Sequence, residues 1–156
     1  QRQMCIRDRF KCNMTDVVAA LGLIQFERYP RMLAKRKKMI EKMDAVLADI
    51  NVTVLNHYGK NHASSGHLYI VRLLGKTREQ TNGVIEKMAE RGIATNVHYK
   101  PLPMMTAYKK MGFDIKDFPN AYHMFENEIT LPLNTKMTME DVDYVMENFV
   151  DIVKSL

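Results

Sequence analysis

His98 and Tyr99 are the side chains of this sequence whose type and position best suit contact with a substrate. Apolar and polar residues alternate along residues 93–99, which predicts a strand with Asn96 and His98 on its polar face. Prolines at positions 101 and 103 predict an irregular loop directly after it. An imidazole in that place could orient a substrate or exchange a proton with it. The competing interpretation is a structural histidine whose ring is satisfied by its own neighbours.

Lys11 and Asn13 form a second candidate site, in a short polar segment before a helix that Thr15 is expected to cap. The N-terminus of a helix presents backbone N–H groups and the positive end of the helix dipole, and both attract a phosphate. Lys11 could add a point charge to such a site. On the residues alone, an exposed cation and an ordinary turn residue are the simpler explanation of this pair.

The other histidines do not form a recognisable metal or catalytic site. His57 and His62 lie in a polar loop over residues 56–66, where we expect an exposed surface and no metal ion. His67 is in phase with the apolar positions of a predicted strand over residues 67–74, so we expect it to be packed. Phosphate-loop, HExxH, GxSxG and CxxC motifs are absent, so the sequence shows no active site that could work by itself.

The charge and cysteine content argue against several classes of partner. The 156 residues carry a net charge of +5, with 21 basic and 10 acidic residues in positions 1–116 and 2 and 8 in positions 117–156. The densest basic run, residues 31–38, spreads around a helix instead of forming one face, so a nucleic-acid partner is not expected. No apolar run approaches the ~20 residues of a membrane helix. Cys5 and Cys12 are too few for a disulfide framework or a zinc site, which favours a reducing, cytoplasmic compartment.

Apolar periodicity and capping residues predict the order α, β, β, α, β, α, β, α, without internal repeats. The first helix should start at Thr15 and kink or end at Pro30, before a second amphipathic stretch that ends near residue 50. The further expected elements are strands over residues 51–55 and 67–74, a helix between Thr77 and Gly92, the strand over residues 93–99, helices over residues 104–111 and 119–128, a strand over residues 129–133 that Pro132 places at an edge or bulge, and a final helix opened by Thr138. This order predicts an α+β fold in which helices pack on a small, largely antiparallel sheet.

Several motifs resemble the DegT/DnrJ/StrS family of pyridoxal-phosphate-dependent sugar aminotransferases. Residues 13–23 (NMTDVVAALGL) are similar to the segment that follows that family's large domain. Residues 65–72 (SGHLYIVR) are similar to a strand of its small domain, and residues 91–102 (RGIATNVHYKPL) are similar to its RGI–HYxPL block. The same order and spacing continue in residues 118–121 (FPNA), 131–133 (LPL) and 138–142 (TMEDV). The resemblance covers the chain from about Phe10 to its end.

This resemblance implies that residues 10–156 are the C-terminal small domain, with its leading helical arm, of a homodimer with an aspartate aminotransferase-like fold. Such enzymes use pyridoxal 5'-phosphate to move an amino group from a donor such as glutamate to a nucleotide-linked keto-sugar, in amino-sugar biosynthesis. It implies that Lys11 and Asn13 contact the cofactor phosphate bound by the partner subunit, and that His98 and Tyr99 lie on the substrate side. Family members often have Asn where Lys11 stands, and Arg or Asn where Asn13 stands.

The resemblance also implies that this chain does not transaminate by itself. The Schiff-base lysine and the acidic partner of the pyridine nitrogen lie in the family's large domain, and none of the 14 lysines here stands in the Schiff-base motif. We expect residues 1–9 to be an artefactual or disordered tail, because residues 4–9 (MCIRDR) resemble a translated sequencing adapter. The alternative hypothesis is a free-standing α+β module that senses a ligand or binds a protein partner without catalysis.

Overall fold

The structure, a computed structural model, describes residues 14–156. The chain divides into two compact units, residues 1–32 and residues 33–156, and each is described by itself. In the first unit, helix α1 (Asp16–Leu47) begins, and most of its apolar side chains there are exposed. Helix α1 runs on into the second unit, where Met39, Ile40, Met43 and Leu47 are buried.

The sequence predicts a kink or an end of the first helix at Pro30, and of these two outcomes the end does not occur, because α1 continues through this residue. A proline inside a helix removes one backbone hydrogen bond and crowds the preceding turn. In a helix of 32 residues that single loss is outweighed by the remaining hydrogen bonds and by the burial of the later residues.

The second unit contains a three-stranded antiparallel sheet in the order β1 (Val52–Val54), β4 (Tyr69–Leu73), β5 (Glu128–Leu131). A separate two-stranded hairpin, β2 (Tyr58–Gly59) and β3 (His62–Ala63), lies within the predicted polar loop. β5 lies at the edge of the sheet and ends just before Pro132, as the position of that proline predicts.

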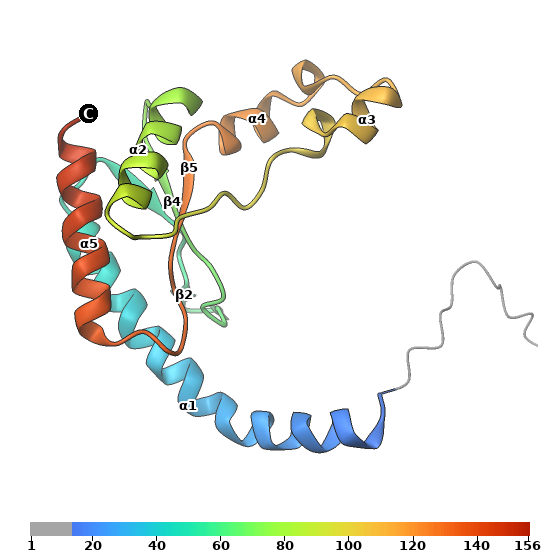
Figure 1. Cartoon of the computed structure of the whole chain (residues 1–156), viewed down its shortest axis with the longest axis vertical. Coiled ribbons are helices and arrows are strands. Elements are labelled where there is room, and N and C mark those ends of the chain that lie inside the picture. The colour runs from blue at the N-terminus through green and yellow to red at the C-terminus, as the bar shows by residue number, and fades with distance from the viewer. Residues whose placement is uncertain (1–13) are drawn as a thin grey trace, which may run out of the picture. The chain divides into compact units, whose positions relative to one another are not determined.

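Helices cover one face of this sheet. α2 (Arg78–Glu90), α5 (Met139–Lys154) and the later part of α1 lie on the same side of β4 and β5 (Figure 1). Along β4, Tyr69, Val71 and Leu73 are buried against the helices, while Ile70 and Arg72 between them are half-buried. The core also includes Val84 and Met88 of α2, Ile129 and Leu131 of β5, and Val142, Val145, Met146, Phe149 and Ile152 of α5. The predicted α+β arrangement of helices on a small antiparallel sheet is thereby confirmed.

Both helices that follow a threonine cap begin where the sequence predicts. The Thr77 hydroxyl accepts the N–H of Gln80 while the Gln80 side chain accepts the N–H of Thr77, and Thr138 and Asp141 form the same reciprocal pair at α5. Gly92, two residues after α2, has a φ of 74°, a conformation that glycine adopts without strain.

The connection between the sheet strands β4 and β5 carries four short helical turns after α2. These are η1 (Leu102–Met104), α3 (Thr106–Lys110), η2 (Ile115–Asp117) and α4 (Pro119–Phe125). The predicted helix over residues 104–111 is shorter than expected, because Met105 is extended and separates η1 from α3. The last turn, α4, begins at Pro119 as predicted.

The predicted strand over residues 93–99 is wrong. Within this segment only Asn96 pairs with the sheet, through an isolated bridge to Thr130. The Asn96 side chain accepts the N–H of Val97 at 2.8 Å, and the Glu128 carboxylate accepts the N–H of His98 at 3.0 Å. Side chains thus take the backbone donors that a regular strand would use for its ladder.

Two histidine predictions are also wrong. His67 is exposed, because β4 begins only at Tyr69 and Gly66, with a φ of 62°, turns the chain just before it. His57 was expected on an exposed loop, yet it is only 5% exposed and stacks on the Tyr69 ring at a centroid distance of 5.8 Å. Stacking on a buried ring draws the imidazole into the core.

None of the helices in the described part of the chain combines the length and the apolar character that crossing a bilayer requires.

The buried ring of His57 predicts a loss of stability at low pH. Burial lowers the pKa of His57 from its ordinary value of 6.5, and the negative charge of Asp44 opposes that shift. The unfolded chain therefore takes up the proton more readily than the folded one, so the free energy of unfolding should fall as pH drops below about 6.5. Urea denaturation at pH 8 and at pH 5.5 measures this difference.

The control for this prediction is a pair of histidine variants. His57→Phe keeps a stacked ring without a titrating group and should reduce the pH dependence, whereas His67→Gln, at an exposed position, should leave it unchanged. An equal pH dependence in wild type and His57→Phe would contradict the prediction.

Candidate functional site

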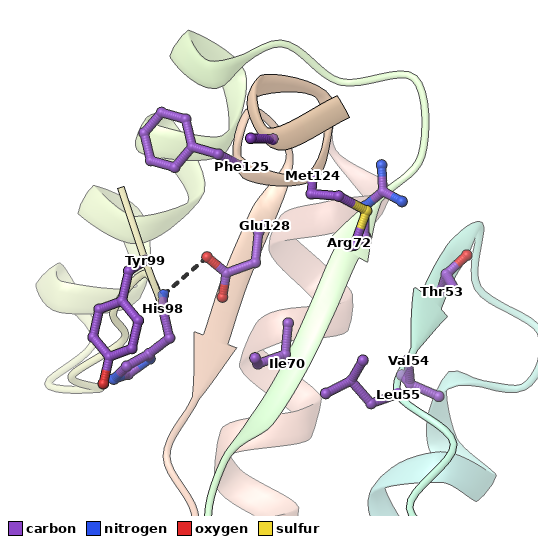
Figure 2. Close-up of a pocket in the computed structure, with 11 residues that line it drawn as sticks. Thr53, Val54, Leu55, Ile70, Arg72, His98, Tyr99, Met124, Phe125 and Glu128 are labelled. Atoms are coloured by element: carbon purple, nitrogen blue, oxygen red, sulfur yellow. Dashed lines mark hydrogen bonds between the residues drawn. The ribbon is translucent and has the colours of Figure 1, made fainter. Parts of the chain in front are cut away.

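A hollow of about 340 Å³ lies on the face of the sheet opposite the helices (Figure 2). Ile70 and Arg72, the β4 residues that alternate with the core positions, are among the residues that line it. The hollow is lined by Thr53, Val54, Leu55, Ile70, Arg72, His98, Tyr99, Ala121, Met124, Phe125 and Glu128. Mostly apolar walls with a few polar groups are typical of sites for small molecules.

His98 is held at this hollow by β5. Its backbone N–H donates to Glu128 Oε2 at 3.0 Å, and its ring nitrogen Nδ1 lies 2.9 Å from Thr130 Oγ1. The Thr130 hydroxyl in turn donates to Glu128 Oε1 at 2.7 Å. The Nδ1 side of His98 is therefore satisfied within the structure, as the structural interpretation expects, while Nε2 makes no hydrogen bond to the described residues.

Tyr99 lies beside His98 and is 74% exposed. The two rings meet edge to face at a centroid distance of 4.7 Å, and the peptide bond between the residues is cis. The structure thus brings the two predicted substrate-side residues together at one wall of the hollow.

Arg72 contributes the positive charge of the hollow. Its Nε donates to Asn127 Oδ1 at 3.0 Å, and one terminal nitrogen donates to the carbonyl of His123 at 3.1 Å. These two bonds join the middle strand to α4 and to the turn between α4 and β5. They hold the guanidinium in place where the sheet meets α4.

Arg78 at the start of α2 fixes the same turn from the other side. One terminal nitrogen donates to the carbonyls of Phe125 at 3.0 Å and Glu128 at 3.1 Å, and its Nε donates to Asn82 at 2.8 Å. The guanidinium also lies over the Phe125 ring, 5.0 Å from its centroid. Burial lowers the pKa of Arg78, and the negative charge of Glu128 works against that shift. An arginine remains charged in any case, so it is a fixed cation beside Glu128.

Comparison with known proteins agrees with this architecture. The model of the DegT/DnrJ/EryC1/StrS aminotransferase family matches residues 6–150. The chain belongs to this family. The resemblance predicted from the sequence motifs is thereby confirmed.

Individual family members match over nearly the whole chain. Spr1654 of Streptococcus pneumoniae, assigned as a sugar aminotransferase and solved in a PLP form and a PMP form, is 49% identical, with a TM-score of 0.90 over 94% of this chain. The spore coat polysaccharide biosynthesis protein SpsC of Bacillus subtilis is 34% identical over 93% of this chain. A UDP-4-amino-4,6-dideoxy-N-acetyl-beta-L-altrosamine transaminase of Campylobacter jejuni is 27% identical over 94%.

The chain spans only 37–39% of the length of these family members. The aspartate aminotransferase-like fold expected for the small domain agrees with the match to the Streptococcus pneumoniae structure.

The other predicted site residues, Lys11 and Asn13, lie outside the described residues, so their role stays a prediction. The helix that they precede does begin at Asp16, and the Thr15 hydroxyl accepts the N–H of Val18 at 3.4 Å.

Sequence reasoning missed Arg72, Glu128 and Thr130. A signal for two of them was present, since Arg72 and Glu128 are charged residues inside otherwise apolar strands. A charge in such a place is costly unless it is hydrogen-bonded or paired. Thr130 gave no comparable signal, because threonine is common in strands.

We expect Arg78→Lys to lower the free energy of unfolding by about 1–3 kcal/mol, because one ammonium group cannot reproduce the fork that binds two carbonyls and Asn82. Urea denaturation measures the loss. Hydrogen exchange should also become faster in residues 125–128.

The matched control is Arg91→Lys, which alters an exposed ion pair with Asp151 at the other end of α2. This change should cost about 0–1 kcal/mol. Equal losses in the two variants would show that the Arg78 contacts have no special role.

Proposed function

We propose that the full-length protein containing this chain is a pyridoxal-phosphate-dependent aminotransferase that acts on a nucleotide-linked keto-sugar, with a glutamate-type amino donor. The observation that carries this proposal is the family match over residues 6–150, supported by 49% identity to a structure solved in PLP and PMP forms. The name of the Campylobacter jejuni relative, a UDP-linked amino-sugar transaminase, supports the substrate class.

In this proposal residues 10–156 form the small C-terminal domain with its helical arm, and they are inactive alone. The enzyme is a cytoplasmic homodimer whose arm reaches the partner subunit. Exposed apolar side chains on the first part of α1, including Val17, Leu21 and Phe26, support a role for this segment in contacts beyond the chain itself. Neither nucleic acid nor a membrane has a part in this function.

Pyridoxal phosphate, when bound, carries the amino group and stabilises the negative charge that develops at the reacting carbon. Lys11 and Asn13 would meet its phosphate just before the N-terminus of α1, where the first backbone amides have no partner within the helix. The negative charge of Asp16 in the first turn would repel a phosphate there, and the positive charge of Lys11 would offset that repulsion. The Schiff-base lysine belongs to the part of the enzyme that this chain does not span.

His98 and Tyr99 serve the sugar substrate in this proposal. The imidazole presents Nε2 as a hydrogen-bonding group, and the exposed Tyr99 ring offers a flat apolar face beside it. Arg72 places a positive charge at the same hollow, which suits an anionic substrate.

The full-length protein, supplied with pyridoxal phosphate, glutamate and a UDP-linked 4-keto-sugar, should form 2-oxoglutarate and the amino-sugar in equal amounts. Coupled detection of 2-oxoglutarate and chromatography of the nucleotide sugar measure both products. Failure to aminate UDP- or dTDP-linked keto-sugars, in a protein that folds and binds the cofactor, would reject the proposed function. It would favour a ligand-sensing or protein-binding module.

Replacing Lys11 and Asn13 together by alanine should weaken cofactor retention by on the order of tenfold, because each charge-assisted contact to phosphate contributes about 1 kcal/mol or more. Absorbance of the bound cofactor during dialysis measures the effect.

The matched control is Lys60→Ala with Asn61→Ala, another Lys and Asn pair, which is exposed in the β2–β3 hairpin. It should retain the cofactor like the wild type. Unchanged retention in the Lys11 and Asn13 variant would remove their assigned role.

A further inference from the structure

Glu128 and Thr130 are buried polar residues on β5, with exposed fractions of 5% and 6%. A buried carboxylate is costly unless its oxygens accept hydrogen bonds. Here Oε2 accepts the backbone N–H of His98, and Oε1 accepts the Thr130 hydroxyl. The carboxylate is therefore satisfied on both oxygens, and both bonds lead to His98.

These bonds determine which atom donates the proton in the contact between His98 Nδ1 and Thr130 Oγ1. A threonine hydroxyl has one proton, and that of Thr130 is directed to Glu128 Oε1 at 2.7 Å. Toward His98 Nδ1, 2.9 Å away, Thr130 can then only accept a hydrogen bond. The proton of that contact must come from the imidazole, so Nδ1 carries it.

From this geometry we propose that Thr130 and Glu128 are positioning residues that hold the neutral His98 ring as the Nδ1–H tautomer, with Nε2 unprotonated. Which ring nitrogen carries the proton is set by the hydrogen bond that the other groups offer it. Glu128 orients Thr130, and Thr130 orients the ring. Neither residue needs to touch a substrate.

The groups around Glu128 are consistent with this direction of the hydrogen bonds from His98 through Thr130 to Glu128. Arg78 donates to the Glu128 carbonyl, and its guanidinium is a fixed cation near the carboxylate. Arg72 is the residue opposite Glu128 on β4. A carboxylate group in this setting accepts hydrogen bonds and donates none.

The consequence concerns the other ring nitrogen. Nε2 of His98 makes no hydrogen bond to the described residues, and it is not among their buried unpartnered atoms. In the Nδ1–H tautomer this nitrogen is an acceptor, able to bind a hydroxyl or amino group or to take up a proton. That it does so for a nucleotide-linked sugar rests on the proposed function, whereas the tautomer itself does not.

Nitrogen NMR of the full-length protein labelled with ¹⁵N-histidine tests the proposal. Long-range proton–nitrogen spectra at pH 8.5 distinguish the protonated from the unprotonated ring nitrogen, and loss of a signal in His98→Gln assigns it. The wild type should show Nδ1 protonated and Nε2 unprotonated. A predominantly Nε2-protonated ring would overturn the proposal.

Thr130→Val removes the hydroxyl at nearly constant volume and should shift the tautomer ratio toward Nε2–H by on the order of tenfold. Thr130→Ser should restore the wild-type spectrum. Thr95→Val is the matched control, since the Thr95 hydroxyl is buried and has no hydrogen-bonding partner among residues 14–156, and it should change nothing. Equal shifts in the two valine variants, or no shift in Thr130→Val, would reject the proposal.

Glu128→Gln gives the sharpest test. The amide oxygen must accept the backbone N–H of His98, so the amide nitrogen faces Thr130 and donates to it. The hydroxyl then turns its proton toward Nδ1, and the ring should change to the Nε2–H tautomer. A Glu128→Gln protein that keeps the wild-type tautomer would show that Glu128 does not set the direction of the hydrogen bonds to His98.

A kinetic measurement separates this proposal from the proposed function. In an active aminotransferase, Thr130→Val should lower kcat/KM for the keto-sugar, and Thr130→Ser should recover it. If the wild type has no aminotransferase activity, the proposed function fails while the spectra still decide the tautomer. If the wild type is active and the spectra of the variants are unchanged, only the present proposal fails.

Discussion

Burial of the Glu128 carboxylate at the edge of a three-stranded sheet is the constraint on which the site depends. A carboxylate in this place must find donors, and it takes them from the His98 backbone and the Thr130 hydroxyl. The same demand keeps residues 93–99 from forming a regular strand. One buried charge thus sets both the path of the backbone and the orientation of the histidine ring.

The two faces of the sheet carry different kinds of side chain. On one face, alternate residues of β4 pack against α1, α2 and α5 and form the core. On the other face, Arg72 and Glu128 line the hollow, and α4 with residues 98–99 closes its sides. Two arginines tie the α4–β5 turn to the rest of the domain. The sheet can in this way present polar groups from a rigid support.

The sequence predicted those elements whose determinants are local. Capping pairs at Thr77 and Thr138 marked two helices, because both partners lie within one turn. Pro132 marked an edge strand, since proline cannot donate to a ladder. Local patterns failed for His57, because stacking on Tyr69 buries a ring that the polar loop suggested would be exposed. They failed for His67, because the turn at Gly66 overrides the apolar alternation. At Pro30 the local pattern left a kink or an end open, and the helix continues, since a long helix tolerates one missing bond.

For the function, the sequence by itself determined the family and the fold class and singled out His98 and Tyr99 as candidates, because these follow from motifs that are contiguous in the chain. Only the tertiary structure showed that Glu128 and Thr130 contact His98 through hydrogen bonds, and that Arg72 lies at the same hollow. Glu128 and Thr130 lie 30 and 32 positions from the histidine along the chain. Hydrogen bonds between side chains depend on distance and direction in space, and no local period of a sequence carries that information.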